Sequence, residues 1–456
     1  MLLKRVCSLG FLAFGFHAAV AAAQAPAPEP AAPAPEPAPA PAPVPVVVAA
    51  PVAAPEPAPP APVPEAPVPE APVIRAYALI KPTIIVANDA VDSFSQPNAS
   101  AATAAGNPVI AGADGKPFMS FQAAQARLGF WFAEKSPVRG HFEFDFIDFA
   151  KATPTTQALP RLRIATVEWK LSDSVQIHAG QDWDLYQPVN PHSFNIVSVA
   201  YQAGNTGFMR QQVKLIYTTP SLELGTAIGM PGINAGAKLA VPELGVLPSL
   251  AVRAAALLGT AGRIGVSALA TRWTPGIHTA AERNAFAGAA GLFGDVTPAE
   301  RFNLRFEAYF ARNGGNTGML SLGAGSLTED IDEVGGVVSA KYGVTEAHSL
   351  YLLGGIAKVL NDDKVTPGYV YPAPPATAMP GDIPAASTAT LAAGNPGMKQ
   401  NLVGRLGYEY RHDKSVAFVL EGFFFNSEHV LNTVDTARFD EKQTAVGAEI
   451  GLLFTL

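Results

Sequence analysis

The sequence contains a single cysteine among 456 residues, and this residue, Cys7, lies near the N-terminus. If that segment is removed on export, the remaining chain has no thiol, which excludes disulfides and cysteine-ligated metal sites. Charged residues make up only 15% of the chain, well below the roughly 25% of ordinary soluble domains. No long basic run is present and the net charge is −7, so the composition argues against nucleic-acid binding.

Beyond the N-terminal segment, the sequence also lacks any apolar run of about 18 residues, the length a transmembrane helix needs. A bundle of membrane-spanning helices is therefore excluded, although 48% of the residues are hydrophobic. The remaining way to place such a chain in a membrane is a closed β-barrel, in which neighbouring strands pair every backbone polar group.

The N-terminal 23 residues have the pattern of a bacterial export signal. Lys4 and Arg5 precede an apolar run over 9–16, and the small residues 21–23 fit a cleavage site. We therefore predict a signal peptide over 1–23. The alternative is a membrane anchor, which the short apolar run disfavours.

Residues 24–74 are dominated by Pro, Ala and Glu, with 20 of the 42 prolines and no Lys or Arg. Such a segment cannot pack a core, so we predict a disordered, extended periplasmic spacer. Two roles remain open for it: a tether that contacts the cell wall through residues 26–72, or a passive linker.

Residues 75–456 show the two-residue period of β-strands. Phe142, Phe144 and Phe146, for example, alternate with His141, Glu143 and Asp145. We expect about sixteen strands, with fourteen to eighteen left open, and Pro82 is expected to cost the first strand a ladder bond. The candidate strands are 76–87, 122–133, 139–149, 161–171, 174–181, 207–217, 221–229, 249–258, 262–273, 283–293, 301–311, 333–343, 347–358, 399–410, 415–425 and 442–456.

The connections between these strands alternate between short and long. Short turns are expected at 134–137, 171–174, 218–221, 259–262, 294–300, 344–347 and 411–414, and the long loops include 88–121, 182–206, 230–248, 312–332 and 359–398. Outer-membrane barrels have this alternation, with short periplasmic turns and an even strand number. The predicted fold is therefore an all-β, transmembrane, antiparallel up-and-down barrel in the bacterial outer membrane.

The C-terminal segment Glu449-x-Gly451-x-x-Phe454-x-Leu456 resembles the signal that the barrel-assembly machinery reads, with Leu456 where an aromatic residue is usual. The barrel region as a whole resembles the general bacterial porins. That resemblance implies a sixteen-stranded, usually trimeric channel for small hydrophilic solutes.

A narrower resemblance covers about forty residues. His178-Ala-Gly-Gln-Asp-Trp183, a long loop, and the segment 204–217 that contains Arg210-Gln211 look like the DcaP-like porins. That family is associated with dicarboxylate uptake, so the resemblance implies the same solute class here. The family's N-terminal extension is a coiled coil, whereas the extension here is rich in Pro and Ala.

Side-chain parity predicts which charges face the lumen. The basic set outnumbers the acidic set eleven to seven, and arginine binds carboxylates through two parallel hydrogen bonds, so we expect a modest preference for anions such as dicarboxylates. The alternative is that these charges only pair with one another and brace the wall. The basic set is Lys81, Arg127, Arg139, Arg163, Arg210, Lys214, Arg253, Arg263, Arg305, Lys341 and Arg405, and the acidic set is Glu143, Asp145, Glu223, Glu307, Glu409, Glu421 and Glu449.

The loop at 182–206 is the expected constriction, because it is the third long loop and the third outer loop of general porins folds inward. Asp182, Trp183, Asp184 and Tyr186 open this loop. Carboxylates here are expected to face wall arginines, with Arg210 and Lys214 as the partners. A solvent-exposed cap is the alternative.

No H-E-x-x-H or G-x-S-x-G motif is present, so neither an enzyme nor a cofactor or metal site is predicted. The competing function is a structural anchor that links the outer membrane to the cell wall through the spacer.

Overall fold

The computed structural model describes residues 74–88, 117–146, 160–186, 189–196, 200, 203–205, 209–230, 247–273, 284–314, 330–362, 369–370, 390–391, 397–430 and 442–456. The predicted signal peptide, 1–23, and all but the last residue of the predicted spacer, 24–74, lie outside these ranges. Among the described residues, no helix has the length and apolarity to cross a membrane.

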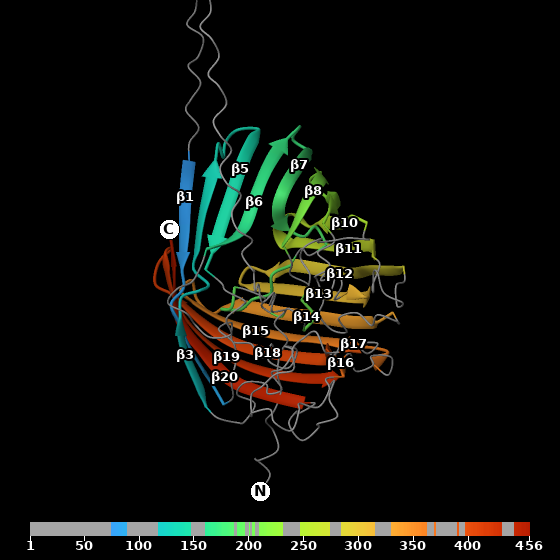
Figure 1. The fold of residues 1–456 in the computed structure, drawn as a ribbon. Coiled ribbons are helices and arrows are strands. Elements are labelled where there is room, and N and C mark those ends of the chain that lie inside the picture. The colour runs from blue at the N-terminus through green and yellow to red at the C-terminus, as the bar shows by residue number, and fades with distance from the viewer. Residues whose placement is uncertain are drawn as a thin grey trace, which may run out of the picture. The chain divides into compact units, whose positions relative to one another are not determined.

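The described residues form a closed antiparallel β-barrel (Figure 1). One sheet contains 18 strand segments. β1 (Ile74–Ile80) and β2 (Thr83–Ala87) are the halves of one interrupted strand, and so are β3 (Phe118–Gln122) and β4 (Arg127–Phe132). The 18 segments therefore make sixteen strands, which confirms the predicted fold class and strand number.

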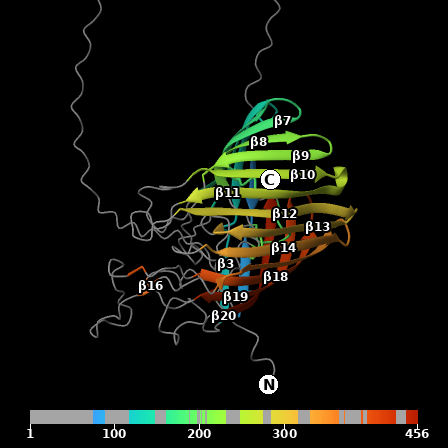
Figure 2. The same ribbon diagram turned by 90° about the vertical axis from the view of Figure 1, so that its right-hand side faces the viewer.

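Strands that are consecutive in the sequence pair with each other around the barrel, as the labels from β7 to β14 in Figure 2 show for one side. The barrel closes where β20 pairs with both β1 and β2. The remaining strands are β5 (Val138–Asp145), β6 (Arg161–Lys170), β7 (Val175–Trp183), β8 (Met209–Thr218), β9 (Leu222–Gly229), β10 (Ser249–Leu257), β11 (Gly262–Trp273), β12 (Ala285–Ala299), β13 (Phe302–Arg312), β14 (Asp332–Gly343), β15 (His348–Val359), β18 (Gly397–Arg411), β19 (Val416–Val430) and β20 (Lys442–Thr455). A short pair, β16 (Tyr369–Val370) and β17 (Thr390–Leu391), forms a separate sheet, and a 3-10 turn, η1 (Gly259–Ala261), precedes β11.

The expected effect of Pro82 is confirmed, because the first strand breaks at Lys81 and Pro82. The neighbouring strand breaks at the same level, over 123–126. Gln125 lies in that second gap and is 1% exposed, so the two gaps hold a buried polar side chain rather than open backbone.

Two predicted boundaries differ from the structure. The segment 294–300 was expected to be a turn, but β12 continues to Ala299 and is irregular between Val296 and Ala299 in its pairing with β13. β7 extends through Trp183, so Asp182 and Trp183 end a strand and the loop begins at Asp184.

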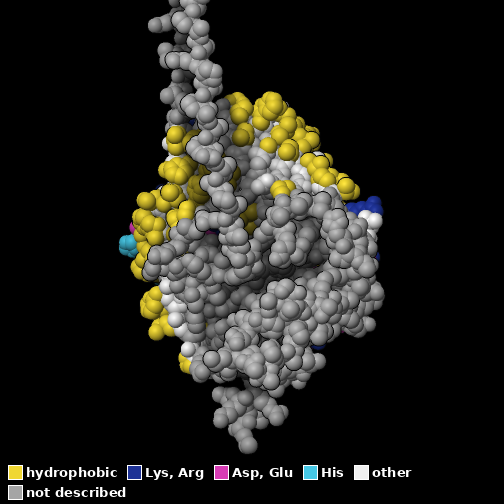
Figure 3. Space-filling model, in the orientation of Figure 1, with side chains coloured by type: hydrophobic (Ala, Val, Ile, Leu, Met, Phe, Trp, Pro, Cys, Tyr) yellow, Lys and Arg dark blue, Asp and Glu magenta, His cyan; other side chains and the backbone are white. Residues whose placement is uncertain are grey.

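Large apolar side chains cover the outer face of the barrel, as the yellow side chains in Figure 3 show for the described residues on one face. On β10, for instance, Leu250 and Val252 are 59% and 53% exposed, whereas Ala251 between them is 3% exposed. Such an apolar outer band matches the surface that lipid covers in membrane barrels.

Part of the barrel interior is a dry apolar core rather than open space. Leu353, Val403 and Phe425 face inward from β15, β18 and β19, and each is 1% exposed. Ala200 and Ala203, from the connection between β7 and β8, belong to the same buried cluster. That connection therefore packs against the inner wall.

Candidate pore and constriction

The connection between β7 and β8, residues 184–208, lies inside the barrel wherever the structure describes it. Leu185, Tyr186 and Val189 are at most 2% exposed. The backbone carbonyls of Leu185 and Tyr186 accept hydrogen bonds from Arg253 on β10 at 3.1 Å and from Ser267 on β11 at 2.9 Å. We call this connection the inward loop.

One glycine of the inward loop and one of the wall allow the two backbones to approach closely. Gly204 has φ +104°, and a Cβ there would lie 2.0 Å from the carbonyl oxygen of Gly336 on β14. A Cβ on Gly355 of β15 would lie 2.2 Å from the carbonyl oxygen of Ala203. Any larger residue at these positions would displace the loop, because a backbone carbonyl cannot move on its own.

A fully buried ion pair holds the middle of the inward loop. The Glu421 carboxylate pairs with Arg405, and both side chains are 0% exposed. Glu421 also accepts hydrogen bonds from the Ser193 hydroxyl at 3.0 Å and from the Phe194 amide at 2.7 Å. The pair therefore satisfies two polar groups of the loop as well as its own charges.

A second buried pair lies beside it, where the first two strands break. Lys81 pairs with Glu449 at 2.6 Å and donates to Gln125 at 2.9 Å. Its ammonium lies 3.9 Å from the centre of the Phe194 ring. The Gln125 side chain also accepts a hydrogen bond from the Ile196 amide at 3.2 Å. The strand break thus supplies partners for the loop.

A cavity of about 280 Å³ lies between the inward loop and the wall. Its lining includes the cationic side chains Arg127, Arg305 and Lys341 and one carboxylate, Glu409. His192 reaches the same cavity from the loop, and its Nε2 lies 2.6 Å from the Asn303 carboxamide oxygen. The cavity is therefore polar and richer in positive than in negative groups.

His192 gives a pH prediction. Burial, and then the Arg305 guanidinium, lower the pKa of His192 to about 4. Lys341 lowers the pKa further, whereas the hydrogen bond to Asn303 and the Asp295 carboxylate raise it. His192 is therefore neutral at ordinary pH, and its protonation near pH 4 adds positive charge to the cavity. Because the docked state resists protonation, docking of the loop is strongest above the ordinary histidine pKa and weakens as the pH falls toward 4.

We expect ion selectivity to stay constant from about pH 7 to 5 and to shift toward anions near pH 4. Reversal potentials measured against pH test this, with His192→Asn as the control that should lose the His192 share of the acid response. A selectivity step near the ordinary histidine pKa, absent in His192→Asn, would contradict this assignment.

The structure gives most of the predicted basic residues a carboxylate partner within ion-pair distance. The pairs are Lys81–Glu449, Arg139–Glu168, Arg163 with Glu143 and Asp145, Arg210–Asp184, Lys214–Asp182, Arg253–Glu223, Arg263–Glu223, Arg305–Asp295, Lys341–Glu409 and Arg405–Glu421. Arg127 is the exception in this set, with no described carboxylate at that distance. The pore-lining role of these residues stays a prediction.

The four residues expected to open the constriction lie together with their expected partners. Asp184 accepts a hydrogen bond from Arg210 at 2.7 Å, and Asp182 pairs with Lys214. Both partners are on β8, the strand next to β7, so these ion pairs lie along the wall. Trp183 lies 5.5 Å from the Arg163 guanidinium, and Tyr186 is buried.

Sequence parity missed several lumenal carboxylates. β6 has an extra residue at Arg163, because Glu143 pairs with Ile164 and Phe144 with Leu162. Beyond this bulge the even-numbered residues of β6 face inward, including Glu168. The sequence pattern places Asp295 in a turn, and so leaves it out of the lumenal acidic set. The lumenal basic set likewise leaves out Arg161, the first residue of its strand. The excess of positive charge is therefore smaller than parity predicts.

The unequal solvent exposure of the paired charges restores part of the excess of positive charge. Arg139 is 38% exposed and its partner Glu168 12%, and Lys341 is 29% exposed and its partner Glu409 14%. Arg161–Asp145 and Arg263–Glu223 follow the same order, Arg305–Asp295 is nearly balanced and Lys214–Asp182 is reversed. Arg163–Glu143 and Arg253–Glu223 are also reversed, but the difference in exposure is larger in the pairs whose cation is the more exposed member.

No protein-family model matches the sequence, and no curated protein matches it. The structure is similar to the outer membrane channel DcaP of Acinetobacter baumannii, with a TM-score of 0.60 and 13% identity over 85% of this chain and 99% of that one. It is also similar to an anion-selective porin from Comamonas acidovorans, with a TM-score of 0.49 and 9% identity over 85% and 100% of the chains. The likeness to DcaP establishes the fold alone, and confirms the fold that the porin resemblance implied.

Proposed function

We propose that this protein is an outer-membrane porin that allows passive diffusion of small hydrophilic solutes, with a modest preference for anions such as dicarboxylates. The observation that carries the proposal is a sixteen-stranded barrel that is apolar outside and charged inside. A barrel of that size can enclose an aqueous channel. The similarity to the outer membrane channel DcaP agrees with this proposal at the level of the fold.

The preference for anions follows from how the wall charges are presented. Selectivity in a wide pore depends on its diameter and on the charges that line it. The cation is the more exposed member in four ion pairs, and by wider margins than the carboxylate is in four others. The cavity beside the inward loop has three cations and one carboxylate. Arginine also matches the geometry of carboxylates.

Conductance recordings of the purified protein in a planar lipid bilayer distinguish the channel hypothesis from the anchor hypothesis. The porin proposal predicts stepwise conductance, and it predicts that a chain lacking 26–72 conducts equally well. Silence from a correctly folded barrel, together with envelope blebbing in cells that carry the same deletion, would favour a structural anchor tethered to the cell wall.

We further propose a homotrimer, which rests on the porin resemblance. The outer faces of β10 and β12 carry small residues, among them Ala254 and Ala256, which would suit close contact between subunits. Conductance that closes in three equal steps is the expected result. Single closing steps together with a monomeric mass in detergent would contradict it.

A further inference from the structure

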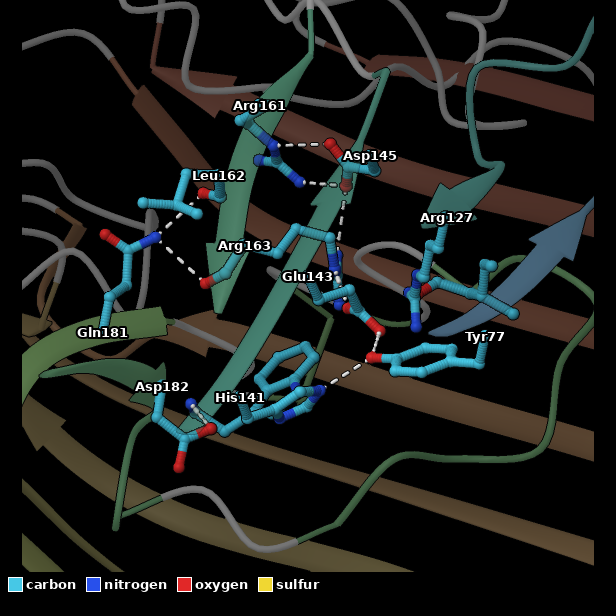
Figure 4. A network of polar contacts seen from close by, with 12 residues as sticks. Tyr77, Arg127, His141, Glu143, Asp145, Arg161, Leu162, Arg163, Gln181 and Asp182 are labelled. Carbon is cyan, nitrogen blue, oxygen red and sulfur yellow. Dashed lines mark hydrogen bonds and ion pairs between the residues drawn. The ribbon is translucent and has the colours of Figure 1, made fainter. Parts of the chain in front are cut away.

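A row of charged side chains follows β5 and β6 along the inner wall, and Figure 4 shows it as one connected network. Arg161 pairs with Asp145 at 2.6 Å, and Asp145 also pairs with Arg163 at 3.2 Å. Arg163 donates to Glu143 at 2.6 Å, and the Tyr77 hydroxyl joins Glu143 to His141. We call Arg161, Asp145, Arg163, Glu143, His141 and Arg139 the charged strip.

The charged strip is wet at both ends and buried in the middle. Arg161 lies where the long connection enters β6, and its side chain is 28% exposed. Arg139 lies next to the short turn and is 38% exposed. Arg163, between them, is 1% exposed. The strip therefore reaches water at both ends and is most deeply buried at Asp145 and Arg163.

The buried middle of the strip has hydrogen-bond donors that have no acceptor among the described residues. The Nη2 of Arg163 is buried and donates to none of them. Arg127 lies beside it on β4; its Nη2 donates to the Ile196 carbonyl at 2.6 Å, and its Nε is buried without a partner. Two guanidinium groups with spare donors can exchange hydrogen bonds with a passing anion.

The wall formed by β15, β18 and β19 is apolar where the inward loop docks on it, although β18 and β19 carry the Arg405–Glu421 pair further along. Leu353, Val403 and Phe425 are 1% exposed, and Ala200 and Ala203 of the inward loop lie in the same apolar cluster. An ion that entered this region would lose its water without gaining a partner, since apolar constrictions block conduction by excluding water.

We propose that solutes pass the inward loop off the barrel axis, along the charged strip on β5 and β6. Arg127 and Arg163 then select anions in the most deeply buried part of this route. This inference rests on the proposed porin function and assigns its route. It requires the loop to stay docked on the apolar wall while side chains of the strip rearrange, so that Arg163 exchanges carboxylate partners for the passing anion.

Two cysteine substitutions distinguish the two walls. Thr166 lies on β6 beside the strip and is 3% exposed, and Val403 lies in the apolar wall and is 1% exposed. Both are conservative changes, and Thr166 Oγ1 has no hydrogen-bond partner among the described residues. Cys7, in the predicted signal peptide, is the chain's only cysteine, so the chain without 1–23 provides a thiol-free background.

The probe is the anionic reagent sulfonatoethyl methanethiosulfonate, applied during single-channel recording. The cysteine thiolate attacks the sulfenyl sulfur, a mixed disulfide forms, and methanesulfinate leaves with the electron pair of the broken bond. We expect Thr166→Cys to react and lose about half or more of its conductance, because the adduct narrows the path and adds negative charge to it. Val403→Cys should not react.

A charge change tests the selecting pair. Arg127→Gln should reduce the anion-to-cation permeability ratio by about twofold or more, and it orphans no described carboxylate. Lys358→Gln removes the same charge from an exposed position on β15 and should leave the ratio unchanged.

The outcomes separate the route from the function. A channel that conducts while Val403→Cys reacts and Thr166→Cys does not would overturn the route and leave the porin proposal standing. Equal permeability ratios in Arg127→Gln and Lys358→Gln would overturn the role of Arg127. A folded protein that never conducts would overturn the porin function, and the route with it.

Discussion

Replacing Gly355 with valine is expected to raise single-channel conductance about twofold or more, because the substitution removes a surface on which the inward loop rests. A Cβ at this position would lie 2.2 Å from the Ala203 carbonyl oxygen and 3.1 Å from Val403 Cγ1. The wall strand itself tolerates valine, which favours β-structure. The loop, rather than the barrel, therefore has to move.

The neighbouring glycine provides a matched control. A Cβ on Gly354 would meet nothing within 4 Å, because this residue faces outward on the same strand. Gly354→Val should leave conductance unchanged. Equal conductance in Gly355→Val, Gly354→Val and the parent protein would show that the inward loop does not restrict the channel.

Truncating Glu421 to alanine should cause the largest loss of stability among single changes in the wall. The substitution leaves the fully buried Arg405 without its carboxylate and removes the acceptor of Ser193 and Phe194. Removing one partner of a buried pair typically costs about 3–5 kcal/mol. The melting temperature of the β-structure in detergent, followed by circular dichroism, measures the effect.

Two further variants separate loss of the pair from loss of an unpaired charge. Glu409→Ala breaks ion pairs with Lys341 and Arg411, whose side chains are 29% and 47% exposed. Water reaches both cations, so each pair should contribute closer to the about 0–1 kcal/mol of surface pairs. The double variant Arg405→Met with Glu421→Leu removes both buried charges and should recover the part of the loss that comes from the unpaired Arg405, while Ser193 and the Phe194 amide still lack their acceptor. If Glu421→Ala melts no earlier than Glu409→Ala, the buried pair is not what holds the loop and wall together.

The fold could be predicted from sequence because strand periodicity and turn chemistry are local properties. Alternation over segments such as 301–311, separated by short turns at one end and long connections at the other, led to the correct strand number. Pro82 also marked the break in the first strand, since proline cannot donate a ladder bond.

The site was less predictable because its features depend on contacts between distant residues. The bulge at Arg163 reverses the parity of β6 and hides the inward position of Glu168. Gly355 reads as an ordinary strand glycine until the loop is seen to pack against it. Position next to the loop predicted Arg210 and Lys214 as partners of its carboxylates, whereas the partners of the other lumenal cations followed from neither composition nor spacing.

The reversal potential of the purified protein in a KCl gradient tests the central claim most directly. An aqueous path along the charged strip, where Arg127 and Arg163 have buried donors with no partner among the described residues, predicts open channels with a reversal potential on the chloride side. The shift should shrink in Arg127→Gln and persist in Lys358→Gln. A reversal potential on the potassium side, unchanged in Arg127→Gln, would contradict an anion path along this wall.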